Sequence, residues 1–338
     1  MQSLSPPSLR LNTAEVPAPP ALLPSVSIVI PTGNRQAALS RSVPAALANP
    51  AAAQVIVVVN GSRDGSVAAL EPLERTNARL VVIVTKSAGE NVARQRGAEA
   101  ATSEVVLFLD DDVVATPDLA AGHARHHRDG HGRVVLGYMP VGPDQLRNDA
   151  EARLYGADYE HLCSQFEQDS TRVLIDLWGG NVSLRRADAL AVGFESGFAL
   201  GQHTDTEFGI RCHRHGLVGI FDRTLRAEHH YVRTRAEFLD KAREQALARM
   251  VIHRLHADVM PPWLPEYYLS GIPRPLRWAL HAGSGNRFGN LELHTFEWIQ
   301  RASHVLGRRR VEDRALFLAR AVVQLDSWQR SQPSPPPE

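Results

Sequence analysis

Three adjacent carboxylates, Asp110, Asp111 and Asp112, follow an apolar run that ends at Leu109. Neighbouring carboxylates repel one another, and burying them is costly unless a positive charge compensates. Divalent cations such as Mg²⁺ and Mn²⁺ prefer carboxylate oxygens and often share them with substrate phosphates. The cluster therefore indicates either a cation site or an acidic loop that caps a helix. In a cation site we expect Asp112 to hold the metal and Asp110 to bind ribose, whereas substitution of Asp111 should matter least.

The segments around this cluster alternate between short β-branched runs and helix-like stretches. Continuous apolar strands separated by helices are typical of a parallel sheet covered on both faces, whose ligands bind at the carboxyl ends of the strands. Asn60 follows the second run, so we expect it in the same cleft as the carboxylates. Strands are predicted at 25–31, 54–59, 79–85 and 104–109, and helices at 34–48, capped by Asn34, and at 89–101.

The second half of the chain is less regular. A polar stretch up to about residue 170 is predicted to be mainly helical, as is the chain after Thr234. His123, His126 and His127 have the spacing of metal ligands on a helix, but a solvated helix face is the favoured interpretation. Strands are predicted at 133–140 and 217–222, a loop entering a strand at 177–186, and a helix at 205–215 that ends at Gly216.

Four motifs in order resemble the nucleotide-binding half of family 2 glycosyltransferases, which have the GT-A fold. Residues 31–35 read PTGNR where that family has PTYNR, and residues 59–66 read VNGSRDGS where it commonly has DDGSxDGS. The helix at 89–97 keeps most of the family's NxGxxxARNxG pattern, including Arg94. The aspartate cluster matches the family's aspartate pair. The resemblance covers about residues 26–114.

The resemblance implies an α/β GT-A fold, with a mostly parallel sheet flanked by helices and a helical C-terminal extension. It also implies a nucleotide-sugar donor, with a UDP-sugar as first choice, and Mg²⁺ or Mn²⁺ as cofactor. Asn60 stands where the family usually has Asp, which replaces a pure acceptor by a donor and acceptor and leaves the base open. The residues implied to bind the donor are Pro31, Thr32, Asn34, Arg35, Asn60, Arg94, Asp110, Asp111, Gly180 and Asn181.

The segment WGGNVSLRR and the acidic motif after it resemble the family's second half. The family draws its catalytic base from an acidic pair that opens a helix, and Thr204-Asp205 stands there, so Asp205 is implied to be the general base. Thr204 and Glu207 also have capping-box spacing, which makes Glu207 structural. In several GT-A enzymes a histidine after the last strand completes the metal site. His229 or His230 stands there, and His230 is slightly favoured.

Composition restricts the possible partners and the location of the protein. Lys+Arg and Asp+Glu both number 37, so the net charge does not indicate nucleic acid or an acidic membrane as partner. Two cysteines fit a reducing, cytoplasmic location, and no apolar stretch is long enough for a membrane-spanning helix. The N-terminus lacks the features of a signal peptide. The predicted units are a flexible Pro-rich arm at 1–24, a GT-A domain at 25–232 (halves 25–115 and 116–232), a helical region at 233–330 and a disordered tail at 331–338.

The sequence thus predicts a metal-dependent, inverting glycosyltransferase that acts on a hydroxyl of a glycan, a lipid-linked sugar or a small molecule. A nucleotidyltransferase and a non-catalytic nucleotide-sugar-binding protein remain alternatives, the latter because Gly33, Asn60 and Thr204 replace family residues. Aromatic residues of the C-terminal region could line an acceptor groove, a contact between copies of the chain or a peripheral membrane contact, although packing in a core is the commoner fate of such residues. The candidate aromatic residues are Trp263, Tyr267, Tyr268 and Trp278.

Overall fold

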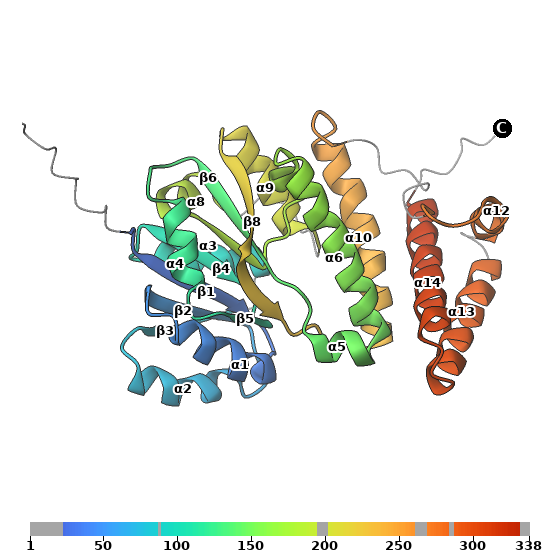
Figure 1. The fold of residues 1–338 in the computed structure, drawn as a ribbon, viewed down its shortest axis with the longest axis horizontal. Coiled ribbons are helices and arrows are strands. Elements are labelled where there is room, and N and C mark those ends of the chain that lie inside the picture. The colour runs from blue at the N-terminus through green and yellow to red at the C-terminus, as the bar shows by residue number, and fades with distance from the viewer. Residues whose placement is uncertain (1–22, 87–88, 195–201, 261–268, 284–286, 332–338) are drawn as a thin grey trace, which may run out of the picture.

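The computed structural model describes residues 23–86, 89–194, 202–260, 269–283 and 287–331. Within these ranges the chain forms one eight-stranded sheet with helices on both faces, and further helices extend from its side (Figure 1). The strand order is β3-β2-β1-β4-β7-β6-β8-β5. Nearly all of the arm predicted at 1–24 and of the tail predicted at 331–338 lies outside the described residues, as do Trp263, Tyr267 and Tyr268.

The first four strands follow the prediction closely. β1 pairs in parallel with β2 and with β4, and β2 pairs in parallel with β3. Their carboxyl ends therefore meet at one edge of the sheet, which brings Thr32, Asn60 and the residues after Leu109 to that edge. These strands are β1 (Val26–Thr32), β2 (Ala52–Asn60), β3 (Leu80–Thr85) and β4 (Val105–Leu109).

The second half of the sheet is mixed in direction. β7 is antiparallel to both β4 and β6, whereas β8 is parallel to β6. The strand predicted at 217–222 is too short, because β8 continues to His229 and pairs there with β5, which directly follows the aspartates. This pairing places His229 opposite Val113. The strands are β5 (Val113–Ala115), β6 (Arg133–Tyr138), β7 (Asn181–Arg185) and β8 (Val218–His229).

Two apolar layers cover the sheet. Alternate residues of β1 point to opposite faces, so Ile28 and Ile30 pack with α1, α2 and α4, whereas Val29 packs with α3, α8 and α9. The bounds are α1 (Gln36–Leu47), α2 (Ser66–Thr76), α3 (Glu90–Ala100), α4 (Leu119–His126), α5 (Pro143–Asn148), α6 (Ala150–Gln168), α7 (Arg172–Ile175), α8 (Arg186–Val192) and α9 (Thr204–Arg214).

Two predicted helix caps are wrong. Asn34 does not cap α1, because its φ of 55° lies in the left-handed region and Arg35 holds the cap position. Thr204 does not cap α9 either: it is the first helical residue, after His203. Glu207 is structural, as expected, but through a 2.9 Å ion pair with Arg211 rather than a capping box.

The C-terminal helices form a separate layer beside the sheet. α14 packs against α10 and α6 through apolar side chains such as Phe238, Leu316 and Val323. α12 and α13 lie on the side of this layer away from the sheet (Figure 1). In the described part of the chain, none of the helices has the length and apolar character to cross a membrane. The bounds are α10 (Arg235–Leu255), α12 (Arg274–Gly283), α13 (Arg287–Val305) and α14 (Arg309–Arg330).

Candidate active site

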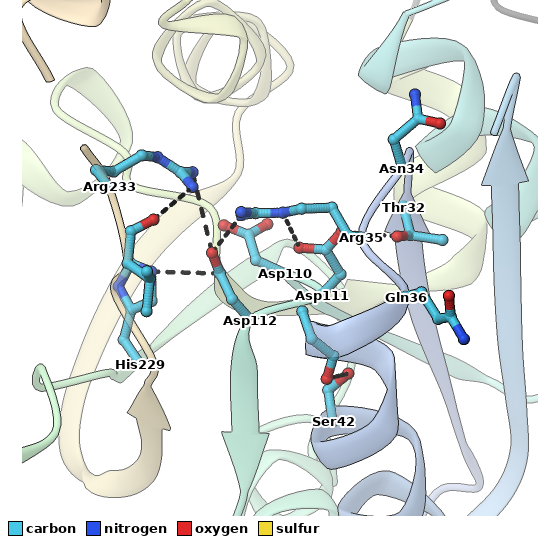
Figure 2. Close-up of polar contacts among 12 residues, drawn as sticks. Thr32, Asn34, Arg35, Gln36, Ser42, Asp110, Asp111, Asp112, His229 and Arg233 are labelled. Carbon is cyan, nitrogen blue, oxygen red and sulfur yellow. Dashed lines mark hydrogen bonds and ion pairs between the residues drawn. The ribbon is translucent and has the colours of Figure 1, made fainter. Parts of the chain in front are cut away.

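Arginines face the three aspartates. Arg94 Nη2 lies 3.1 Å from Asp110 Oδ1, and Arg35 lies 3.3 Å from Asp111 and 2.5 Å from Asp112. Figure 2 shows Arg35 reaching from the start of α1 toward both of these carboxylates, while a second arginine approaches Asp112 from the other side. That residue is Arg233, 4.0 Å from Asp112 Oδ2. The positive charge that the cluster requires is thus supplied, in this structure, by the chain itself.

Asp111 is more constrained than the sequence suggested. Thr32 Oγ1 donates a 2.7 Å hydrogen bond to Asp111 Oδ2, and Arg35 Nε donates to Oδ1 at 3.3 Å. Burial raises the pKa of Asp111 to about 6, although the Arg35 charge opposes the shift. The side chain ties the end of β1 to the loop after β4. The expectation that Asp111 is the least important of the three is therefore not supported by its contacts.

Asp112 meets His229 rather than His230. His229 Nε2 lies 3.3 Å from Asp112 Oδ1, and both side chains are buried. The His230 imidazole instead faces Glu228 at 3.3 Å and Gln145 at 3.5 Å, and only its backbone N–H contacts Asp112. Because successive side chains of a strand point to opposite sides, only one of the pair can reach the aspartate. The structure therefore places His229, and not the slightly favoured His230, beside Asp112.

The charges around Asp112 keep it ionised. Burial alone would raise the pKa of Asp112, but the hydrogen bond and charge of His229, with the charges of Arg35 and Arg233, outweigh burial and lower it. Lys241 of α10 lies near this group, and burial together with the Arg233 charge lowers its pKa. Because Asp112 stays ionised beside several cations, its partners can be exchanged when another charged group binds.

The residues at this edge fit a divalent cation in type. Asp110, Asp112 and His229 offer oxygen and imidazole nitrogen ligands of the kind that Mg²⁺ and Mn²⁺ accept. The buried Nδ1 of His229 has no hydrogen-bond partner among the described residues, so the ring is held by Asp112 and by edge-on packing against Tyr155 and Tyr231 rather than by a second hydrogen bond. No group of three or more His, Cys, Asp or Glu side chains in the described ranges is already arranged around a metal position. Arg35 occupies Asp112 Oδ2 and would have to leave it.

Asp205 lies across the Gly179-Gly180 turn from Asp110. Its Oδ2 accepts the Gly179 N–H at 2.8 Å, and its Oδ1 accepts the Thr206 N–H at 2.9 Å. Burial raises the pKa of Asp205, and these N–H groups and the Arg94 charge oppose the shift. Arg94 and Asp205 both line a small cavity with a free volume of about 10 Å³, room for about one water molecule.

The two glycines permit this close approach. A Cβ on Gly179 would lie 3.0 Å from Asp205 Cβ and 3.8 Å from Arg94 Nη2. A Cβ on Gly180 would lie 2.8 Å from Asp110 Oδ2, closer than real Cβ contacts allow. Gly180 O also accepts the Asp110 N–H at 3.1 Å. The turn thus joins the acids of the two halves, which supports the predicted position of Gly180 near the donor.

Asn181 does not reach this edge with its side chain. It is fully buried, its Nδ2 donates to Leu225 O at 3.0 Å, and its Oδ1 meets His123 Nε2 at 3.0 Å. Asn181 is therefore a structural residue of β7 in this conformation rather than a donor contact. The same bonds overturn the solvated-face interpretation of the α4 histidines, because His123 and His127 are both buried and share Ser183 Oγ at 2.8 and 2.9 Å.

The remaining predicted donor residues shape the loop after β1. Asn34 Oδ1 accepts the Arg63 N–H at 2.8 Å, and the Asn34 N–H donates to Ser62 Oγ at 2.9 Å, so the loops after β1 and β2 are joined. Asn60 Oδ1 accepts from Thr85 Oγ1 at 3.2 Å. Pro31 is buried within β1. The structure thus brings Thr32, Arg35, Asn60 and Arg94 to the strand ends, as the sequence predicted.

Arg233 and Lys241 are the members of the site that the sequence analysis missed. No motif named them, because they follow the last strand, beyond the part that carries the resemblance. One signal was available: Thr234 and Glu237 form a true capping box, which starts α10 directly after Arg233. Such a cap would have fixed the helix start and hence the side of α10 that faces the aspartates.

The sheet order, the crossing Gly179-Gly180 turn and the acids at the strand ends define a domain of the GT-A class. The Glycosyl transferase family 2 model matches residues 27–190. Over this segment the chain is similar to glycosyl transferase family 2. PcManGT, a mannosyltransferase from Pyrobaculum calidifontis solved in complex with GDP-Man and Mn²⁺, has the same fold, with a TM-score of 0.59, 18% identity and coverage of 92% of this chain and 89% of that one.

Curated relatives match over part of their length. Validoxylamine A glucosyltransferase of Streptomyces hygroscopicus subsp. limoneus is 29% identical over 238 residues, which cover 62% of this chain and 52% of the relative. The protein of that name from subsp. jinggangensis (strain 5008) is 30% identical over 232 residues, 60% of this chain and 54% of the relative. The chain spans about half the length of these curated relatives.

Proposed function

We propose that the protein transfers a sugar from a nucleoside diphosphate sugar to an acceptor hydroxyl, with inversion at the anomeric carbon. The observation that carries this proposal is the convergence of Asp205 with Arg94 and Asp110 across the Gly179-Gly180 turn. A base from the acceptor half and charged groups from the donor half then face one reacting centre. The names of the two curated relatives, both glucosyltransferases, support the class of reaction.

Asp205 is the proposed general base. Its two backbone hydrogen bonds fix the carboxylate and leave further lone pairs free to accept the proton of the acceptor hydroxyl. A carboxylate with a raised pKa is a stronger base than an exposed aspartate, which favours proton transfer as the hydroxyl attacks the anomeric carbon. The hydroxyl oxygen forms the new bond to that carbon while the bond to the diphosphate breaks on the opposite side.

The arginines are proposed to exchange carboxylates for phosphates. Arg35 and Arg233 both contact Asp112, and Lys241 lies close to them. When a diphosphate arrives, these cations can bind its oxygens and stabilise the charge of the leaving group. Asp110, Asp112 and His229 would hold a divalent cation, which when bound offsets diphosphate charge. The solved complex of PcManGT, which contains GDP-Man and Mn²⁺, supports this pairing of ligands.

A donor screen tests the proposal. UDP-, GDP- and dTDP-hexoses are each mixed with the protein and Mg²⁺ or Mn²⁺, and the melting temperature and the release of nucleoside diphosphate are measured. A matching donor, with a UDP-hexose as first choice, should raise the melting temperature by mass action and be slowly hydrolysed. Release of pyrophosphate would identify a nucleotidyltransferase instead. Binding of a donor without any turnover, with or without a range of hydroxyl acceptors, would identify a non-catalytic protein.

A further inference from the structure

The segment from Gly271 to Val311 differs in charge from the rest of the chain. It contains the basic residues Arg274, Arg277, Arg287, Arg301, Arg308, Arg309 and Arg310 and the acids Glu292 and Glu297. With 37 basic and 37 acidic residues in all, the remainder therefore has 30 basic and 35 acidic residues. The segment has a formal charge of +5 and the remainder −5. The overall neutrality of the chain conceals this separation.

Large apolar side chains are exposed in the same segment. On α13, Leu291, Trp298 and Val305 are 64, 69 and 84% exposed, and they recur every seven residues. This spacing keeps them on one side of the helix over a length of about 21 Å. On α12, which packs against α13, Trp278 is 76% exposed. The sheet domain does not cover this stripe, because α13 lies on the side of α14 away from it (Figure 1).

The turn between α13 and α14 continues the surface. Leu306 is 67% exposed, and Arg308, Arg309 and Arg310 that follow are exposed as well. None of the exposed residues between Leu291 and Val311 is acidic. Glu297, one of the two acids of the segment, is only 21% exposed and lies 3.6 Å from His294. The outer surface therefore combines exposed aromatic and aliphatic side chains with exposed arginines, and between Leu291 and Val311 it contains no exposed acid.

We infer that the α12–α13 surface and the α13–α14 turn dock on an anionic lipid bilayer. Amphipathic helices that lie in a membrane interface bury Trp and Leu among the headgroups, while neighbouring arginines attract anionic lipids. The remainder of the chain is negative and would be repelled by such a surface, so the charge separation also orients the molecule. A second copy is the poorer occupant, because two identical patches of high positive charge repel each other.

Vesicle co-sedimentation of the full chain tests this inference. Vesicles of phosphatidylcholine alone are compared with vesicles that also contain phosphatidylglycerol, at about 0.1 M and about 1 M salt, between which the screening length falls from about 10 Å to about 3 Å. We expect binding to the anionic vesicles that weakens at high salt. Equal binding to both vesicle types, or binding to neither, would overturn the inference.

Matched variants locate the contact. The R308Q/R309Q/R310Q variant should lose at least tenfold in vesicle affinity, because each arginine near an anionic surface contributes about fivefold. The control R41Q/R75Q/R125Q removes three exposed helix arginines from the sheet domain and so changes the net charge by the same amount. Its vesicle affinity should stay within about threefold of that of the native chain. Equal losses in both triple variants would show that only net charge matters and would contradict the assigned surface.

Apolar variants separate the membrane from a second copy. The W278S/W298S variant should lose vesicle affinity, whereas V218T, which alters a 61% exposed valine of β8, should not. Melting temperatures show whether each variant folds, and the arginine variant keeps the test valid if the tryptophan variant does not. If the chain instead forms dimers that W278S/W298S dissociates, and no vesicles are bound, the surface is a contact between copies and the inference is wrong. These readouts do not depend on glycosyl transfer.

Discussion

Two polar clusters on the same sheet differ in charge, although each contains one buried imidazole nitrogen, on His229 and on His127, without a hydrogen-bond partner among the described residues. At the carboxyl edge, Asp112 has three basic neighbours, of which only one is in close contact. Arg35 lies at 2.5 Å, His229 at 3.3 Å and Arg233 at 4.0 Å. Beneath α4, His123 uses both ring nitrogens, on Ser183 at 2.8 Å and on Asn181 at 3.0 Å. Both clusters contain residues that bind metals elsewhere, so residue type alone does not distinguish them.

The difference lies in what each cluster can exchange. Removing His123 from its partners would leave buried polar atoms unpaired, which is costly inside a protein. At the edge, an arginine that leaves a carboxylate can bind an incoming anionic ligand. The carboxylate that it leaves can then bind another cation. We therefore expect substitutions at the edge to change catalysis and donor binding, and changes in the α4 cluster to alter folding stability.

The largest effect should follow from Asp205→Asn. An asparagine cannot accept a proton from the acceptor, so kcat should fall by about 10²- to 10⁴-fold while donor affinity changes little. Steady-state kinetics and donor titration measure the two quantities separately. Asp144→Asn, at an 81% exposed side chain, is the matched control. A kcat within about threefold of the native value would remove Asp205 from the proposed role.

The two neighbouring histidines offer the sharpest comparison at the metal position. His229→Gln should weaken metal-dependent donor binding by about 10- to 100-fold, as loss of a metal-site residue does elsewhere. His230→Gln should leave it within about twofold, because that ring faces Glu228 and Gln145. Calorimetric titration of donor with Mn²⁺ and with a chelator measures both. Equal losses in the two variants would contradict the assignment to His229.

The sequence predicted the donor half better than the acceptor half, for a physical reason. Parallel strands buried on both faces form continuous apolar runs, and their ends fix where Thr32, Asn60 and the aspartates must lie. β5 has only three residues, and β8 continues beyond its apolar start, so neither follows a recognisable pattern. Without their pairing, the choice between His229 and His230 could not be made.

The ion-pair partners of the charged residues could not be predicted from the sequence either. The arginines beside Asp112 come from the cap position before α1 and from the turn before α10, which are almost 200 residues apart in the chain. The spacing of residues along a sequence does not reveal such contacts. Likewise, a solvated face was the favoured interpretation of His123, His126 and His127, but His123 and His127 are buried against Ser183, and this burial had no sequence signal.

The α4 cluster should make folding sensitive to acid. Burial lowers the pKa of His123 to about 3 and that of His127 to about 4, whereas both titrate near 6.5 in the unfolded chain. Between pH 6.5 and 4 the unfolded chain binds more protons, so stability is present above pH 6.5 and is lost as pH falls. Each histidine should contribute a slope of about 1.4 kcal/mol per pH unit.

Denaturant unfolding across this pH range measures that slope. His127→Gln should lower the free energy of unfolding at neutral pH. It should also make the decline toward pH 4 shallower by the slope that one histidine contributes. His131→Gln, at a 68% exposed ring, is the control and should leave the slope unchanged. Parallel curves for the native chain and His127→Gln would show that the cluster does not govern acid sensitivity.

The smallest effect is expected at the start of α10, where folding and site placement meet. Thr234 Oγ1 accepts the Glu237 N–H at 3.3 Å, and Glu237 in turn accepts the Thr234 N–H at 2.8 Å. Thr234→Ala removes the cap and should lower the free energy of unfolding by about 1 kcal/mol. Because the cap directly follows Arg233, donor affinity should also fall a few-fold, whereas Thr76→Ala, at an exposed helix residue far from the edge, should leave donor affinity unchanged. Thr234→Ser, which keeps the hydroxyl, should restore both quantities. Loss of stability without any change in donor affinity would mean that Arg233 is held in place by its contacts with Asp112 and Tyr231 and not by the helix start.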